Sequence, residues 1–323
     1  MDLPLISFKR DIWDWVKDRT WLEILVRHKS PVMKVGALYH LIEEGRPTLY
    51  PRGLTTLMGD VLYNKREPDT MSPVEKRVVA LQKRTASRVR GKPPPLRGRH
   101  GRLKGWARGL YIHGQIEDYV RLTGAQFLEK YPERMHPWAA LIIRAMYERN
   151  WRPVFGEFLV HDREMLTAHA VDVVGVDEEG VILWIEVKTG DSGGLFDHDE
   201  SCYWRPGTPF AGLGWPATPR HRALTQIMLG ATMGVSNLSL PLGSFRVLVA
   251  HVDNTRVNFI EAEHSFLLAQ APRMFAFLRK VRAKELREKE AAKQAKIRAR
   301  KAKSVHSAGN KGRHVDCPQQ DRI

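Results

Sequence analysis

Three short apolar segments between residues 153 and 190 constrain the fold more than any other part of the chain. They read PVFGEFLVHD, TAHAVDVVGVD and GVILWIEVKTG, and the polar turns DREM and DEEG separate them. β-Branched residues dominate each segment, and each is too short for a typical buried helix. The sequence therefore predicts three consecutive antiparallel strands.

Helical patterns and a second strand pair flank these segments. Apolar residues at helical spacing run through 109–124, 137–150 and 220–234, and again through 264–281. The segments SFRVLVAHVD and TRVNFIEAE are typical of two paired strands. A long irregular loop is expected over 191–219, where aromatic side chains would either stack on bases or cover the core. The order predicts an α/β fold without internal repeats.

The domain prediction divides the chain into four parts. Residues 1–82 are expected to be a helical N-terminal region, because DIWDWVKDRTWLEILVRHK and MKVGALYHLIEEG carry apolar residues at helical spacing. A basic linker or arm follows over 83–108, the central domain spans 109–278, and a basic, largely disordered tail occupies 279–323.

The basic arm combines charge of one sign with residues that disfavour a packed core. Residues 83–108 hold ten Lys or Arg and no acid, and include a triplet of prolines. One interpretation is a segment that contacts phosphates, and the other is a soluble basic linker. The residues predicted to bind nucleic acid are Arg88, Arg90, Lys92, Arg97, Arg99, Arg102 and Lys104, together with Arg222 of the helix over 220–234.

The tail is also basic, with twelve Lys or Arg and three Glu between residues 279 and 303. It is expected to begin as a solvated helix and then to lose order. Solubility, nucleic-acid contact and a nuclear import signal all remain open as its role.

Charge and the rest of the composition favour an intracellular protein with a polyanionic partner. The formal net charge is +16 and the pI is near 10.0, which points first to nucleic acid and second to an anionic membrane surface. No apolar run is long enough to span a membrane, and the N-terminus lacks a signal-peptide pattern. Two distant cysteines exclude a disulfide framework and a cysteine zinc site. A nuclear location is expected for a eukaryotic or viral protein, and a cytoplasmic one otherwise.

The segment WIEVKTG places two charges in a strand that is otherwise apolar. Side chains alternate along a strand, so Glu186 and Lys188 face one way and Val187 the other. Asp172 lies on the preceding strand and can lie across from Glu186 if the intervening turn is tight. Unpaired buried charges are costly, so these groups need partners or a metal.

Two carboxylates and a lysine on adjacent strands suit metal-dependent phosphodiester hydrolysis. Mg²⁺ or Mn²⁺ bound by Asp172, Glu186 and the carbonyl of Val187 would keep open positions for a phosphate and a water. Lys188 would orient or deprotonate that water. The alternative is a buried ion pair with no catalytic role.

These residues resemble the motif of the PD-(D/E)xK nuclease superfamily, and the chain is similar to its RecB-like and lambda-exonuclease-like branch. EVKTG matches the E/D-x-K-T motif, and Gly109, His113 and Glu117 match the spacing of the first helical motif. Glu157 and Gln226 occupy the positions of a frequent strand glutamate and of the glutamine-containing helix motif. The resemblance covers about residues 109–234, with strands continuing to about 263.

The resemblance implies a restriction-endonuclease-like core, a small mixed sheet flanked by helices. It implies His113 as a further metal ligand and Glu117 as a catalytic acid that orders the metal through water, with Glu157 and Gln226 in support. The alternatives are an ordinary polar pair of His113 and Glu117 on a surface helix, a solvated strand residue at 157 and a loop-capping glutamine at 226.

Three positions depart from the family pattern. His169 stands where the family commonly has a small residue, Val171 replaces the proline, and Gly230 replaces a tyrosine one helical turn after Gln226.

The expected function is therefore hydrolysis of DNA by a Mg²⁺- or Mn²⁺-dependent nuclease. The favoured form is an exonuclease that acts on DNA ends in recombination, repair or genome processing. A structure-specific endonuclease and an RNA-cleaving nuclease are alternatives with the same chemistry. A non-catalytic nucleic-acid-binding protein on a nuclease fold is the third, and the oligomeric state is left open.

Overall fold

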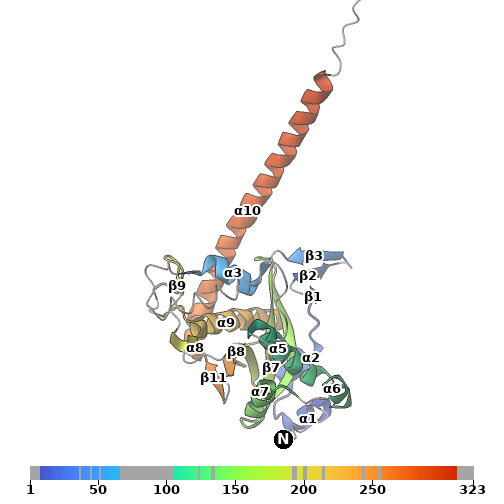
Figure 1. The fold of residues 1–323 in the computed structure, drawn as a ribbon, viewed down its shortest axis with the longest axis vertical. Helices are drawn as coiled ribbons and strands as arrows, with labels where there is room; N and C mark the ends of the chain where they lie inside the picture. The colour runs from blue at the N-terminus through green and yellow to red at the C-terminus, as the bar shows by residue number, and fades with distance from the viewer. Residues whose placement is uncertain are drawn as a thin grey trace, which may run out of the picture. The chain divides into compact units, whose positions relative to one another are not determined.

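The computed structural model describes twelve stretches of the 323-residue chain (Figure 1). These are residues 8–35, 38–43, 46–50, 52–65, 105–122, 124–131, 135–190, 195–198, 202–212, 215–241, 244–252 and 256–310. The chain divides into two compact units, Met1–Phe277 and Leu278–Ile323. Most of the basic arm lies outside the described residues.

A six-stranded mixed sheet forms the centre of the first unit. Its order is β11-β10-β8-β7-β4, and β6 pairs with β7 on the other side. β8–β10 and β4–β7 are parallel, and the remaining pairs are antiparallel. The predicted three-strand run and the second strand pair are confirmed. The strands are β4 (Arg52–Gly53), β6 (Trp151–Asp162), β7 (Thr167–Asp177), β8 (Ile182–Thr189), β10 (Phe245–Val252) and β11 (Val257–Glu261).

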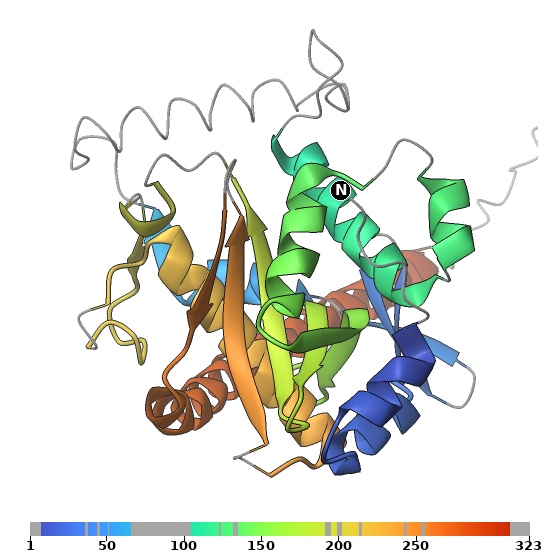
Figure 2. The ribbon, with the colours of Figure 1, turned by 90° about the horizontal axis from the view of Figure 1, so that it is seen from below.

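Helices cover both faces of this sheet (Figure 2). On one face, α5 (Gly105–Arg121) and α7 (Pro137–Tyr147) share a core with apolar side chains of β7, β8 and β10. On the other face lies α9 (Pro219–Leu238), where a Cβ at Gly234 would meet the Trp184 ring at 2.2 Å. The predicted α/β class, with a mixed sheet flanked by helices, is confirmed.

The N-terminal part differs from the predicted helical region. Two helices, α1 (Phe8–Trp15) and α2 (Thr20–Arg27), precede three antiparallel strands, β1 (Val32–Val35), β2 (Leu38–Glu43) and β3 (Arg46–Tyr50). The predicted helix over 33–45 is wrong. Val32 and Leu41 are buried while Val35 and Leu38 are about half exposed, which is the two-residue alternation of strands.

The same part of the chain also belongs to the first unit rather than to a domain of its own. β4 joins the central sheet beside β7, and α3 (Leu54–Val61) leads into β5 (Tyr63–Lys65), which pairs with β9 (Cys202–Trp204).

The segment expected to be an irregular loop carries short elements, β9 and α8 (Leu195–His198). Trp204 and Phe210 are buried and stack with ring centroids 4.7 Å apart. These two aromatic side chains therefore cover the core, whereas Tyr203 is 39% exposed.

The C-terminal helix α10 (His264–Asn310) is longer than predicted and contains Pro272. The prediction of a largely disordered tail is wrong as far as Asn310. Side chains over 287–299 are exposed, and their Ala, Lys, Arg, Glu and Gln content favours a helix without a packed face. Residues 311–323 lie outside the described part.

Within the described residues, no helix has the length and apolar character needed to cross a bilayer.

Asp118 ties α5 to α6 (Gly124–Lys130). Its carboxylate is 4% exposed, and it accepts hydrogen bonds from Lys130 Nζ at 2.5 Å, the Tyr131 hydroxyl at 2.6 Å and Arg121 Nη2 at 2.9 Å. Burial alone would raise the pKa of Asp118, but the bonds from Lys130, Tyr131 and Arg121 lower it below its ordinary value of 3.8.

We expect Asp118→Asn to lower the free energy of unfolding by about 1–2 kcal/mol near neutral pH, because a charge-assisted network is lost while its cations stay half exposed. A depressed folded pKa stabilises the fold above the unfolded pKa, and this stabilisation is lost as the pH falls through the folded pKa. Urea unfolding at several pH values should therefore show the two proteins converging below pH 3.8. Asp14→Asn, at an exposed helix position, is the control, and a gap that stays constant with pH would contradict the assignment.

Candidate active site

Three acidic residues lie at the same level on three neighbouring strands. β6 and β7 pair in register on both sides of Glu157 and Asp172. The β7–β8 ladder ends at the pair Val173 and Ile185, whose chain neighbours beyond the ladder are Asp172 and Glu186. The register therefore sets Glu157, Asp172 and Glu186 in a row across β6, β7 and β8.

The alternation of side chains breaks at this row. A Cβ at Gly156 would meet the backbone of α5 at 2.5 Å, whereas Phe158, two residues on, packs against Trp184 on the α9 side of the sheet. Glu157 between them has a left-handed φ of 50°. Non-glycine residues rarely adopt this conformation, and it is often found where a functional site imposes it.

β7 makes the same switch at Asp172. Val173 belongs to the α5–α7 core, and Val171 lies beside Gly230 of α9. On the edge of β7 opposite β6, the pairing with β8 stops at Val173 and the pairing with β4 starts at Ala168. Among the described strands, residues 169–172 have no partner on that edge, and the candidate site lies in this gap.

Asp172 fills part of the gap with its carboxylate. Oδ2 accepts the backbone N–H of Val187 at 2.7 Å, and Oδ1 lies 3.2 Å from His113 Nδ1 of α5. Burial alone would raise the pKa of Asp172, but His113, Lys188 and the Val187 N–H lower it to about 2. Burial likewise lowers the pKa of His113, and Asp172 outweighs it so that the net shift is upward. Asp172 is an anion at neutral pH.

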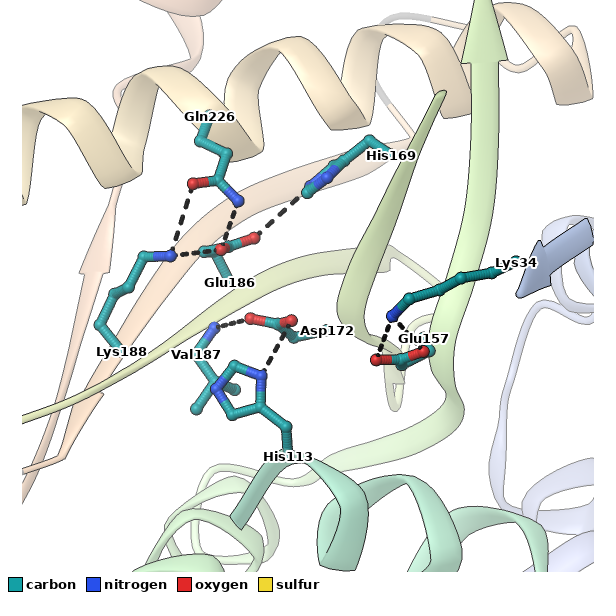
Figure 3. Close-up of polar contacts among 9 residues, drawn as sticks. All are labelled: Lys34, His113, Glu157, His169, Asp172, Glu186, Val187, Lys188 and Gln226. Atoms are coloured by element: carbon teal, nitrogen blue, oxygen red, sulfur yellow. Dashed lines mark hydrogen bonds and ion pairs between the residues drawn. The ribbon is translucent and has the colours of Figure 1, made fainter. Parts of the chain in front are cut away.

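Glu186 points toward α9 and is 2% exposed (Figure 3). Its Oε1 accepts hydrogen bonds from Lys188 Nζ at 2.5 Å and from Gln226 Nε2 at 2.6 Å. Its Oε2 is buried without a hydrogen-bond donor among the described residues and lies 3.6 Å from His169 Nε2. Oε1 thus accepts two hydrogen bonds, whereas Oε2 accepts none from the described residues.

Lys188 shares its face of β8 with Glu186, as predicted, while Val187 packs into the opposite core. Burial lowers the pKa of Lys188, but Glu186 and Asp172 outweigh it and raise the pKa above 10.5. Lys188 therefore carries a positive charge at neutral pH in this arrangement. An ammonium group can orient a water or offset developing negative charge, but it cannot accept a proton.

Glu157 faces a cleft of about 520 Å³ beside the row. Both of its carboxylate oxygens accept hydrogen bonds from Lys34 Nζ of β1 at 2.7 Å. Glu117 of α5 lines the same cleft, and burial together with the negative charge of Glu157 raises its pKa. His113 and Glu117, four residues apart, therefore face two parts of one site rather than pairing with each other.

The structure brings most of the predicted residues together. Asp172 contacts His113 and the Val187 N–H, while Glu186, Lys188 and Gln226 form a second set of contacts. The charges of Asp172 and Lys188 attract each other and link the two sets. Glu157 and Glu117 lie in the adjoining cleft. Arg222 lies against other residues, with its guanidinium over the Tyr63 ring and Nη1 at 3.5 Å from Cys202 Sγ. The seven residues predicted to bind nucleic acid in the basic arm lie outside the described part of the chain.

The sequence interpretation missed Lys34 and the contact of His169. Lys34 is 123 residues from Glu157 in the chain, and its only local signal is an isolated charge in the strand VMKV. His169 was noted only as a departure from a pattern. Its signal is an imidazole in the short apolar run AHAV that precedes Asp172.

The donor set fits a hard divalent cation. Glu186 offers a buried oxygen without a donor, and Asp172 is an anion beside an imidazole. The raised pKa of His113 favours its protonated form in the ion-free site, but a metal ligand must be neutral. Once His113 has lost its proton, two carboxylates outnumber one ammonium, and a bound cation would balance the charge. Across the described residues, no group of three or more His, Cys, Asp or Glu is gathered closely enough to hold a metal by itself. Mg²⁺ commonly uses one or two carboxylates together with water and phosphate oxygens, so that result is compatible with this ion.

Comparison with known proteins gives no assignment, because no protein-family model, curated protein or solved structure matches the chain.

We expect Gly156→Ala to move α5 away from β6, because the added methyl group would meet Glu117 Cα at 2.5 Å. A backbone atom cannot move aside as a flexible side chain does, so the substitution should cost about 1–3 kcal/mol of stability in urea unfolding. Gly114→Ala on the same helix, where nothing lies within 4 Å of the new methyl group, is the matched control. Equal stability of the two variants would contradict the close packing that places His113 and Glu117.

Proposed function

We propose that the chain is a Mg²⁺- or Mn²⁺-dependent nuclease that hydrolyses phosphodiester bonds, built on a restriction-endonuclease-like core. The observation that carries the proposal is the gap in the edge of β7, where Asp172, Glu186 and Lys188 meet with His113 and Gln226 around them. Structural ion pairs can also be buried. A row of three acids at a break in strand alternation, with one carboxylate oxygen left without a donor, is better suited to binding a cation.

The metal would be held by Asp172, Glu186, the carbonyl of Val187 and His113. Such an ion polarises the phosphate and activates a bound water when it is present. Lys188 orients that water and offsets negative charge at the phosphate, which agrees with the raised pKa of its ammonium group. Gln226 holds both Glu186 Oε1, at 2.6 Å, and Lys188 Nζ, at 3.4 Å, so it sets their relative position.

The cleft beside the row would admit the substrate strand. Inside the cleft Lys34 is paired with Glu157, and Glu117 adds a second carboxylate, so attraction for phosphates would have to come from basic residues outside it. The exposed basic side chains of α10 and, by its composition, the basic arm would contact phosphates in this proposal, and the formal charge of +16 favours this partner. DNA is the proposed substrate and action at DNA ends the proposed mode. Cleavage of circular DNA or of RNA would identify the endonuclease or ribonuclease alternatives.

Cleavage of labelled linear duplex DNA, single-stranded DNA, circular DNA and RNA tests the proposal directly. We expect cleavage with Mg²⁺, none with EDTA, and a loss of about 100-fold or more for Lys188→Met, because the substituted side chain cannot stabilise charge. Lys29→Met, at an exposed position, is the matched control. Cleavage in EDTA, or an unimpaired Lys188 variant, would refute the mechanism, and no cleavage of any substrate would favour a non-catalytic binding protein.

Binding of the metal can be tested without a substrate. We expect Mn²⁺ to raise the unfolding temperature of the wild-type protein, since a ligand present at 100 times its Kd stabilises the fold by about 2.7 kcal/mol. Asp172→Asn should show little of this increase, because it removes the anionic ligand. Differential scanning calorimetry with EDTA as the reference measures the effect. An equal increase in both proteins would place the ion elsewhere.

A further inference from the structure

His169 lies in the gap of β7, between the site and α9. Its side chain is 6% exposed, and Nε2 has no hydrogen-bond partner among the described residues. Glu186 Oε2 lies 3.6 Å from this nitrogen and is also buried without a donor among the described residues (Figure 3). With its proton on Nε2, the imidazole would present a donor to this acceptor, and the two buried atoms face each other at slightly more than hydrogen-bonding distance.

Gly230 of α9 provides the space for this imidazole. A Cβ at position 230 would meet His169 Cδ2 at 2.6 Å and Nε2 at 3.3 Å. Glycine in the interior of a helix costs about 1 kcal/mol relative to alanine. The close approach of the His169 ring gives this glycine a packing role.

His169 and Gly230 are two of the three positions at which the sequence departs from the nuclease pattern, and the structure joins them. A large side chain stands at 169, where a small one is expected, and no side chain stands at 230, where a large one is expected. The imidazole therefore occupies the volume that a side chain at 230 would otherwise enter. It reaches Glu186 from β7 rather than from α9.

We propose that His169 is a positioning residue that orients the Glu186 carboxylate through Oε2, and that Gly230 is required to seat its ring. The inference rests on the proposed function. Lys188 and Gln226 fix Oε1 only, and a carboxylate held at one oxygen can still rotate about that point. A donor at Oε2 supplies the second fixed point, and partners of this kind commonly change metal affinity when they are removed.

Isothermal titration of Mn²⁺ into the free protein tests the role of His169 without relying on activity. We expect His169→Ala to weaken binding about 10-fold. His169→Gln places an amide donor at a similar reach and should restore the affinity to within about threefold, as expected when the residue acts by donating a hydrogen bond. Unchanged affinity in His169→Ala overturns the proposal. Failure of glutamine to restore binding also overturns it, because a histidine that ligates the metal directly would behave in that way.

A double-mutant cycle tests the role of Gly230. Gly230→Ala should weaken Mn²⁺ binding in the wild-type background, because the methyl group displaces the imidazole. It should have little further effect in the His169→Ala background, where the ring is absent. Additive effects would overturn the coupling. Gly59→Ala, whose methyl group would meet only Tyr63 Oη at an ordinary 3.5 Å, should bind as the wild type does.

The outcomes separate this inference from the proposed function. Wild-type protein that neither binds Mn²⁺ nor cleaves nucleic acid refutes both. Wild-type protein that binds and cleaves, with His169→Ala and Gly230→Ala equal to it, refutes the positioning role alone. Circular dichroism establishes that each variant is folded. If His169→Ala does not fold, the positioning role is tested by comparing the other two variants with the wild type. The proposal then requires that His169→Gln binds Mn²⁺ nearly as well as the wild type does and that Gly230→Ala binds it more weakly.

Discussion

The rest of the structure depends on one hydrogen bond at the edge of β7, in which a side-chain carboxylate takes the place of a backbone carbonyl as the acceptor. The pairing of β7 with β8 stops at Val173 and Ile185. Beyond this pair, the Asp172 carboxylate accepts the Val187 N–H at 2.7 Å. A buried N–H without an acceptor would be costly, so Asp172 satisfies the backbone at the point where the ladder stops. The same carboxylate is the anion that His113 and Lys188 surround. The Val187 N–H therefore keeps a hydrogen bond where the sheet opens, and the opening brings charged groups from both faces together.

Charge balance explains why the polar residues here form a connected group. Glu186 and Asp172 are largely buried, and ions in such positions require close partners. Lys188 serves both carboxylates, and Gln226 bridges Lys188 and Glu186. Lys34 neutralises Glu157 in the adjoining cleft. Among these contacts one oxygen, Glu186 Oε2, still has no donor, which leaves room for both a cation and the orienting contact from His169.

The sequence could predict the part of the site that depends on local pattern. Alternation in WIEVKTG correctly put Glu186 and Lys188 on one face, and the short turn before it put Asp172 across from Glu186. Contacts between distant segments could not be predicted, because nothing near Lys34 in the chain indicates Glu157 and nothing near His169 indicates Gly230. The error over residues 33–45 has another cause. Their apolar residues fit both the 3.6-residue period of a helix and the two-residue period of a strand. The pairing of β1, β2 and β3 in one sheet stabilises the strand conformation.

Diffraction from crystals containing Mn²⁺, with an anomalous difference map, tests the central claim most directly. The account predicts a peak at roughly 2–2.5 Å from carboxylate oxygens of Asp172 and Glu186 and from the carbonyl oxygen of Val187, in the gap of β7. It also predicts that the peak is absent in Asp172→Asn crystals grown in the same way. A peak bound elsewhere on the chain, or no peak at concentrations that support cleavage, would contradict the account.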